Sequence, residues 1–287
     1  MLVRLKTILL SRFHLASTVA RVATLLGVTV AAAATVVFFG VSEDVVQHNG
    51  LATRDASRLA WITHHRTSTL VSGSKVLDTV GSVGVVVAIA VAIGLLLWWR
   101  RVPIAAAITP VAAVLMAGAT AGALKVIIDR ARPTPAHQLI AEVNQSFPSG
   151  HATDSAALGV SAAIIVAIYL LRRPLARLAV LVVGAVVPVA VAASRLELGV
   201  HWPTDVVAGL ALGATVALVT IGITLGLVSP TPSEPAAPTS GRFQPIANWL
   251  RGHRAAPSST RRLGHSSGKG SVKSPVRPQV GAPTSLA

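Results

Sequence analysis

Three short polar segments interrupt an otherwise apolar chain, and they hold the side chains that could do chemistry. The segments are residues 125–133, 148–151 and 194–205. Their candidate reactive or anion-binding residues are Lys125, Arg132, Ser149, Gly150, His151, Arg195, His201 and Asp205. Charged and nucleophilic side chains are costly beside long apolar runs unless they have a role. This set is suited to attacking a phosphate group and neutralising its charge.

The first segment reads Lys-Val-Ile-Ile-Asp-Arg-Ala-Arg-Pro from Lys125 to Pro133. Lys125 is expected at the outer end of an apolar helix, and Pro133 is expected to stop the chain from continuing as a helix after Arg132. Arginine offers a planar fork to phosphate oxygens, whereas lysine acts as a mobile point charge. Taken alone, the segment is also typical of an ordinary basic helix end.

The second segment, Pro148-Ser-Gly-His151, directly precedes an apolar helix. Gly150 would let the backbone approach a ligand closely, and the start of the helix directs unpaired amides toward an anion. Ser149 is equally well interpreted as a helix cap, and His151 as an interfacial residue.

The third segment places His201 four residues before Asp205. If the last apolar helix begins near Pro203, the carboxylate can orient one imidazole nitrogen and leave the other free as a nucleophile. Such a pair also occurs in purely structural roles. Arg195 precedes it in the same segment.

Composition indicates a membrane protein. The chain has 287 residues, of which 52% are hydrophobic and 12% charged, and its mean hydropathy is +0.67. Soluble domains carry about twice that share of charge. A helix needs about 20 apolar residues to cross a bilayer. The predicted spans are residues 22–41, 76–99, 102–128, 155–171, 175–193 and 206–228. The expected fold is therefore an all-α bundle of six transmembrane helices.

The distribution of the net charge of +15 predicts the orientation. With the N-terminus inside, the basic residues of the N-terminal segment, of two short loops and of the C-terminal tail are cytoplasmic, as the positive-inside rule requires. Both termini are then cytoplasmic, and all three polar segments lie on the outer face of the cell membrane. The charge is thus explained by a bilayer, and nucleic acid is not expected as a partner.

The chain is expected to have three parts: a cytoplasmic segment 1–21, a membrane domain 22–228 and a basic, Pro- and Ser-rich tail 229–287. The tail has too little apolar surface to offset the entropy of ordering it. The outer loop 42–75 could form an interfacial helix that guides substrate, or it could be a simple connector. The sequence leaves the oligomeric state open.

The three segments together closely resemble the type 2 phosphatidic acid phosphatase superfamily. The resemblance rests on Lys-x6-Arg-Pro at 125–133, Pro-Ser-Gly-His at 148–151 and Ser-Arg-x5-His-x3-Asp at 194–205. It implies that Lys125, Arg132 and Arg195 bind phosphate oxygens, with help from Ser149 and the Gly150 amide.

The resemblance also implies the reaction. His201 would be the nucleophile that forms a phosphohistidine, Asp205 its orienting partner, and His151 the acid that protonates the leaving oxygen. No metal or other cofactor is expected, because protein cations supply the neutralising charge. The expected substrate is a lipid phosphate or diphosphate, phosphatidate-like or polyprenyl, with a slight preference for polyprenyl diphosphate.

Other functions remain open at this point. The same intermediate could pass its phosphate to an alcohol or sugar, and a non-catalytic lipid-phosphate binder would use the same cations. The related vanadium haloperoxidases bind vanadate in a similar site, but they are soluble proteins.

Four acidic residues near the segments have less specific interpretations. Asp129 is expected to pair locally with Arg130, Asp78 to lie at an outer helix end, and Asp154 to support a helix start. Glu197, which stands where many relatives have an aromatic residue, could pair with Arg195 or repel a highly charged substrate.

Overall fold

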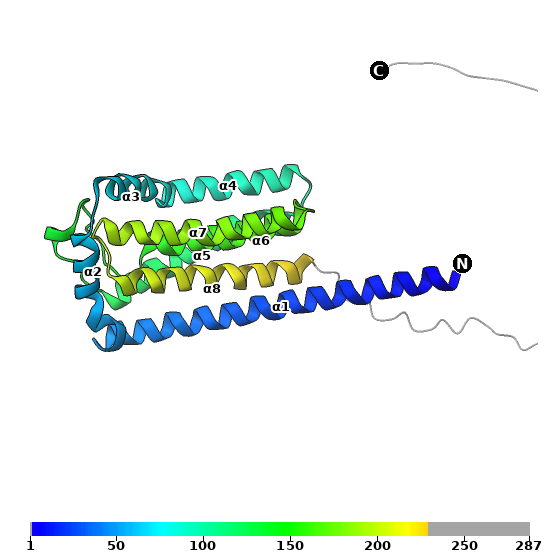
Figure 1. The fold of residues 1–287 in the computed structure, drawn as a ribbon, viewed down its shortest axis with the longest axis horizontal. Coiled ribbons are helices and arrows are strands. Elements are labelled where there is room, and N and C mark those ends of the chain that lie inside the picture. Colours follow the sequence, from blue (N-terminus) through cyan, green and yellow to red (C-terminus); the bar gives the residue numbers. More distant parts are fainter. Residues whose placement is uncertain (1, 229–287) are drawn as a thin grey trace, which may run out of the picture. The chain divides into compact units, whose positions relative to one another are not determined.

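The fold is entirely helical within residues 2–228, the part of the chain that the computed structural model describes (Figure 1). The eight α-helices are α1 Leu2–Val46, α2 Asp55–His64, α3 Ser68–Val80, α4 Val83–Trp99, α5 Ile104–Ile128, α6 Gly150–Tyr169, α7 Pro174–Glu197 and α8 Pro203–Val228. Short 3-10 helices cover Gly50–Arg54 and Pro135–His137. The predicted tail, residues 229–287, lies outside the described residues.

Five helices are long and apolar enough to cross a membrane individually. They are Arg21–Val46 of α1, together with Ile104–Ile128, Gly150–Tyr169, Pro174–Glu197 and Pro203–Gly226. A sixth span is possible if α3 and α4 count as one segment bent by 58°. The predicted all-α membrane bundle is confirmed. The second span differs from the prediction, because residues 76–99 do not form one continuous helix.

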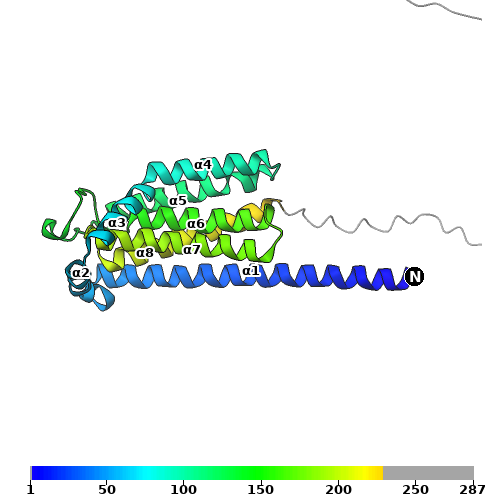
Figure 2. The same cartoon turned by 45° about the horizontal axis from the view of Figure 1, so that its top comes forward.

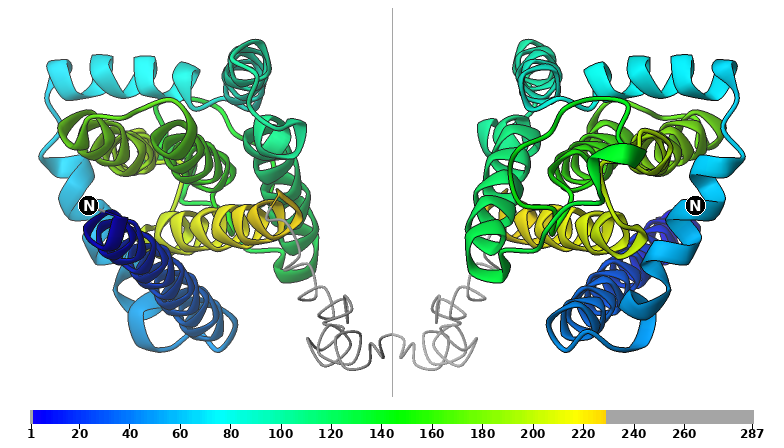
Figure 3. Two further views of the ribbon diagram at one scale, coloured as in Figure 1. Left: turned by 90° about the vertical axis from the view of Figure 1, so that its right-hand side faces the viewer. Right: turned by 90° about the vertical axis from the view of Figure 1, so that its left-hand side faces the viewer.

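The bend between α3 and α4 occurs at Gly81 and Ser82. A Cβ atom at Gly81 would lie 2.5 Å from a methyl group of Val191 and 3.1 Å from the ring of His151. Glycine is therefore required for the end of α3 to approach α7 this closely. In consequence α3 crosses the end of the bundle against α7, while α4 runs alongside α5 (Figures 2 and 3).

Helix α6 lies in the middle of the bundle and packs against α4, α5, α7 and α8 (Figure 3). Small residues make this possible. A Cβ atom at Gly213 of α8 would lie 2.2 Å from the carbonyl oxygen of Thr153, and one at Gly159 would lie 2.3 Å from that of Gly184. Small residues at crossings of membrane helices let the backbones approach closely. The helix that carries His151 is thus fixed on several sides.

Helix α1 packs along α8 (Figure 1). Phe38 and Val41 of α1 are buried against Ala208 and Leu212 of α8, and Phe147 from the loop before α6 joins the same cluster. This cluster supports the end of the bundle at which all three polar segments converge.

Candidate active site

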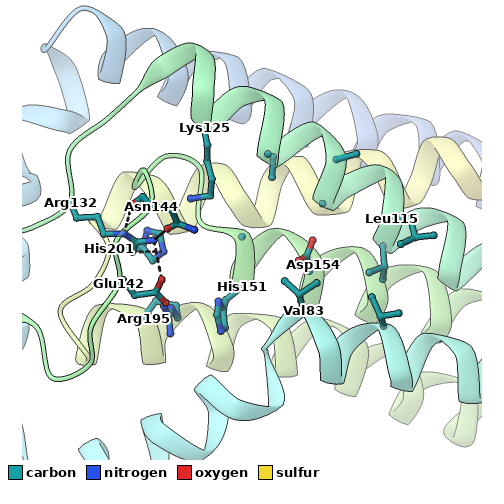
Figure 4. Close-up of a pocket in the computed structure, with 17 residues that line it drawn as sticks. Val83, Leu115, Lys125, Arg132, Glu142, Asn144, His151, Asp154, Arg195 and His201 are labelled. Atoms are coloured by element: carbon teal, nitrogen blue, oxygen red, sulfur yellow. Dashed lines mark hydrogen bonds and ion pairs between the residues drawn. The ribbon is translucent and has the colours of Figure 1, made fainter.

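A cavity of about 370 Å³ opens at one end of the bundle and receives side chains from all three polar segments (Figure 4). Its polar end is lined by Lys125, Arg132, Glu142, Asn144, Gly150, His151, Arg195 and His201. Its other wall is apolar and comes from α4 and α5, with Val83, Val87, Val114 and Leu115. The cavity therefore joins a cationic site to a surface that matches a hydrocarbon chain.

His201 and Asp205 form a buried pair at the start of α8. Nδ1 of His201 lies 3.3 Å from Oδ2 of Asp205, and the two residues are 1% and 0% exposed. On the opposite side of the ring, Nε2 lies 3.2 Å from Nη1 of Arg132. A guanidinium can only donate, so Nε2 is the acceptor and Nδ1 carries the proton. In this tautomer the lone pair of Nε2 accepts from Arg132 on the side of the ring that lines the cavity.

Asp205 is held by several donors besides the imidazole. Ser146 donates its hydroxyl to Oδ2, and the backbone amide of Trp202 donates to the same oxygen at 2.8 Å. Arg130 donates to Oδ1 at 2.5 Å and also to Asp55 of α2 at 2.8 Å. Because these bonds satisfy a fully buried carboxylate, Asp205 can remain ionised and hold the ring of His201.

The expected local ion pair between Asp129 and Arg130 is not formed. Asp129 adopts a left-handed conformation, φ 47°, at the C-terminal end of α5, where its amide bonds to the carbonyl of Lys125. The turn directs Arg130 toward Asp55 and Asp205 instead. Sequence adjacency was misleading here because the turn separates the two side chains.

Arg132 and Lys125 lie at the polar end of the cavity and are both bound to the loop between α5 and α6. Arg132 donates to the carbonyl oxygens of Asn144, at 2.7 Å, and Val200, at 2.6 Å. Lys125 donates to the carbonyl oxygen of Gln145. These contacts aim both cations at the space in front of His201 (Figure 4).

Arg195 is fully buried and pairs with two carboxylates. Its Nη2 donates to Glu142 at 2.5 Å, and its Nη1 donates to Asp78 of α3. Asp78 also lies 3.3 Å from Nε2 of His151. The predicted position of Asp78 at a helix end is correct, but it reaches the site only because α3 crosses the bundle. The alternative pairing of Arg195 with Glu197 is not formed among the described residues, where the ion pairs of Arg195 are those with Asp78 and Glu142.

Ser149 and Gly150 begin α6 beside the cavity. Ser149 is the N-cap residue, but its hydroxyl makes no capping hydrogen bond and is buried without a partner among the described residues. Gly150 lines the cavity, and a Cβ atom there would meet nothing within 4 Å. The side-chain capping interpretation of Ser149 therefore fails, and the start of α6 has open space beside Gly150.

Burial shifts the protonation of the site. Full burial lowers the pKa of His201 well below its ordinary value, despite the opposing effect of Asp205. His201 is therefore neutral near pH 7, as a nucleophile must be. Burial also lowers the pKa of Arg132, but an arginine remains charged at this pH.

Several residues of the site gave no signal in the sequence. Glu142 and Asn144 lie in a loop without a helical or alternating pattern, and Asp55 lies about 150 residues from the helix it supports. Arg130 was visible as a further cation beside Arg132, but its partners were not. Within residues 2–228, no group of three or more His, Asp or Glu side chains has an arrangement that could hold a metal ion.

Comparisons with known proteins point to one family. Residues 106–227 match the PAP2 superfamily. The chain is 38% identical over 90 residues to phosphatidylglycerophosphatase B of Bacillus subtilis (strain 168), and the match covers 31% of this chain and 44% of that protein.

A solved structure also resembles this chain. The crystal structure of a transmembrane PAP2 type phosphatidylglycerolphosphate phosphatase from Bacillus subtilis has a TM-score of 0.64 at 23% identity. The likeness covers 69% of this chain and 96% of that one. The apolar helices and the shared fold indicate a multi-pass membrane protein.

Proposed function

We propose, from the match of residues 106–227 to the PAP2 superfamily, that this protein is an integral membrane phosphatase that hydrolyses a lipid phosphate or diphosphate. The observation that carries the proposal is the geometry of His201. One ring nitrogen lies against the buried Asp205, and the other faces a cavity that contains Lys125, Arg132 and Arg195. The apolar wall of the same cavity would hold the lipid chain.

In the first step, Nε2 of His201 attacks the phosphorus atom. A P–N bond forms while the bond from phosphorus to the leaving oxygen breaks. His151 gives a proton to that oxygen, and the lipid alcohol, or the lipid monophosphate in the case of a diphosphate, departs. Asp205 stabilises the charge that develops on the ring of His201.

In the second step, water attacks the phosphohistidine. His151, now unprotonated, takes a proton from the water as the P–N bond breaks, so that inorganic phosphate is released and both histidines return to their starting states. Lys125, Arg132 and Arg195, with the amide of Gly150, would bind the non-bridging oxygens in both steps. Ser149 is proposed to assist them from the start of α6.

We further propose that the reaction needs no metal ion, because three protein cations supply the charge that a metal provides in other phosphatases. Activity should then persist after treatment with a chelator. From the distribution of basic residues, we place both termini in the cytoplasm and the site at the outer membrane surface. A single membrane domain, residues 22–228, would carry the activity.

The relatives suggest which lipids to test. Both have names that refer to phosphatidylglycerophosphate, a lipid whose outer phosphate is a monoester. Phosphatidate and polyprenyl diphosphate have the same combination of terminal phosphate and apolar tail, so a panel should include all three.

The decisive experiment measures phosphate release by the purified, detergent-solubilised full chain. His201→Ala should abolish release, whereas His65→Ala, which alters an exposed histidine of the connection between α2 and α3, should retain it. Acid-labile phosphate on wild-type protein would mark the intermediate. Normal turnover by His201→Ala would rule out the mechanism. Binding without release would favour a non-catalytic binder, and a phosphorylated acceptor alcohol would favour phosphotransfer.

A further inference from the structure

Asp154 is a buried acidic residue that the proposed mechanism does not use. It lies on α6 three residues beyond His151, and it is 3% exposed. Its Oδ1 has no hydrogen-bond partner among the described residues. The side chain nevertheless lines the cavity, into which Figure 4 shows it pointing. Its predicted role in supporting the helix start is not fulfilled, because it caps no amide.

We infer that Asp154 is a specificity-determining residue, which accepts a hydrogen bond from a hydroxyl group of the lipid between its reacting phosphate and its apolar tail. This inference rests on the proposed phosphatase function. A buried carboxylate without a donor is unfavourable, so its presence in an apolar helix calls for a partner. A donor on a bound ligand would satisfy it.

The space in front of Asp154 depends on Gly118 of α5. A Cβ atom at this position would lie 3.2 Å from Oδ1 of Asp154. A larger side chain would therefore fill the gap between α5 and the carboxylate. Oδ1 itself is buried, but with glycine there no side chain of α5 fills the gap beside the carboxylate, and Asp154 still lines the cavity.

The position of Asp154 along the cavity determines which part of a bound lipid it would contact. His151 and Gly150 lie at the polar end of the cavity, and Asp154 lies about one helical turn deeper on the same helix. Val87 and Leu115 line the apolar wall. A lipid with its phosphate beside His201 and its tail on this wall would place its linker near Asp154.

The chemistry of the site limits which functional groups of the lipid linker could bind Asp154. A carboxylate needs a donor, whereas ester carbonyl groups only accept and a polyprenyl chain offers no polar group. An ammonium group would be a donor, but it would meet the positive charges of Lys125, Arg132 and Arg195. A neutral hydroxyl satisfies Asp154 without this repulsion. Glycerol-type linkers with a free hydroxyl should therefore be preferred over polyprenyl phosphates.

A matched pair of substrates tests the inference. One is a 1-acylglycerol 3-phosphate, which has a free hydroxyl on the carbon next to the phosphate-bearing carbon. The other is its 2-deoxy analogue, which has the same acyl chain and phosphate. The purified wild-type full chain should favour the first by about ten- to a hundredfold in kcat/KM, because a hydrogen bond to a charged group is lost with the analogue. Asp154→Ala should bring the ratio close to one while it still hydrolyses the deoxy substrate.

Asp154→Asn provides a second variant of nearly the same shape. Its amide oxygen can still accept, so its preference should lie between those of the wild type and Asp154→Ala. Equal wild-type rates on the two substrates would overturn the inference and leave the phosphatase function standing. Equal loss of both activities in Asp154→Ala would also overturn it, since it would indicate a structural role. If the wild type released no phosphate from any lipid tested, both proposals would fail together.

Discussion

Nη2 of Arg195 donates to Oε1 of Glu142 at a distance of 2.5 Å. One of the cations that we propose for phosphate binding is therefore already paired with a carboxylate of the protein. The other oxygen of Glu142 lies 3.5 Å from Nη2 of Arg132. Glu142 thus bridges two of the three cations, as a phosphate group would. A substrate phosphate must displace this carboxylate or share its donors.

Replacing Glu142 with glutamine should therefore strengthen substrate binding. The neutral amide competes less well for the two arginines, and we expect KM to fall by about fivefold with little change in kcat, in keeping with the worth of a partly exposed ion pair. Steady-state phosphate release measures both constants. Glu43→Gln, which changes a carboxylate on α1 that bonds only to Gln47 among the described contacts, is the matched control. A rise in KM would instead assign Glu142 a supporting role in binding.

Arg130→Gln should impair both folding and catalysis. Arg130 bonds to the buried Asp205 and to Asp55, so its loss leaves carboxylates without their charged partner. We expect a loss of about 3 kcal/mol in the free energy of unfolding and a fall in kcat that exceeds any change in KM. Thermal unfolding in detergent and steady-state kinetics give the two readouts. Arg58→Gln, which alters an exposed arginine of α2, should behave as wild type. An unchanged kcat in Arg130→Gln would show that Arg130 does not position Asp205 for catalysis.

The buried His201 should make the protein less stable in mild acid. Its pKa is lowered in the folded state, so the unfolded chain binds the proton more readily. Stability is therefore lost as pH falls below about 6.5, the ordinary value for histidine, by at most about 1.4 kcal/mol per pH unit. The unfolding temperature of His201→Gln should fall less between pH 7.5 and pH 5 than that of the wild type. His65→Gln should follow the wild-type curve, and identical slopes for all three proteins would refute the prediction.

Gly213→Ala should loosen the contact between α6 and α8. The added methyl group would lie 2.2 Å from the carbonyl oxygen of Thr153, which cannot move without its helix. We expect a loss of about 1–3 kcal/mol in stability. Gly222→Ala is the matched control on the same helix, because a Cβ atom there meets nothing within 4 Å. It should be neutral or slightly stabilising, since alanine favours helices. Thermal unfolding compares the two, and equal effects would contradict the packing argument.

The class of fold and the main residues that line the cavity could be predicted from the amino-acid sequence. Long apolar runs require helices in a bilayer, because each backbone polar group must be satisfied within its own segment. The spacing of Lys125, Arg132, His151, Arg195 and His201 beside the ends of these runs predicted that they would share one end of the bundle. They do line one cavity. Their individual roles are still proposals.

The partners of these residues could not be predicted in this way, because they depend on how the helices pack. The break at Gly81 carries Asp78 to His151 and Arg195, and the turn at Asp129 sends Arg130 to Asp205 instead of to its neighbour. The position of Glu142 likewise depends on the path of the loop between α5 and α6. The position of Asp154 depends on the packing of α6 against α5. Periodicity reports which face of a helix is apolar, but it does not report how helices cross or where an irregular loop runs. Those depend on contacts between segments far apart in the chain.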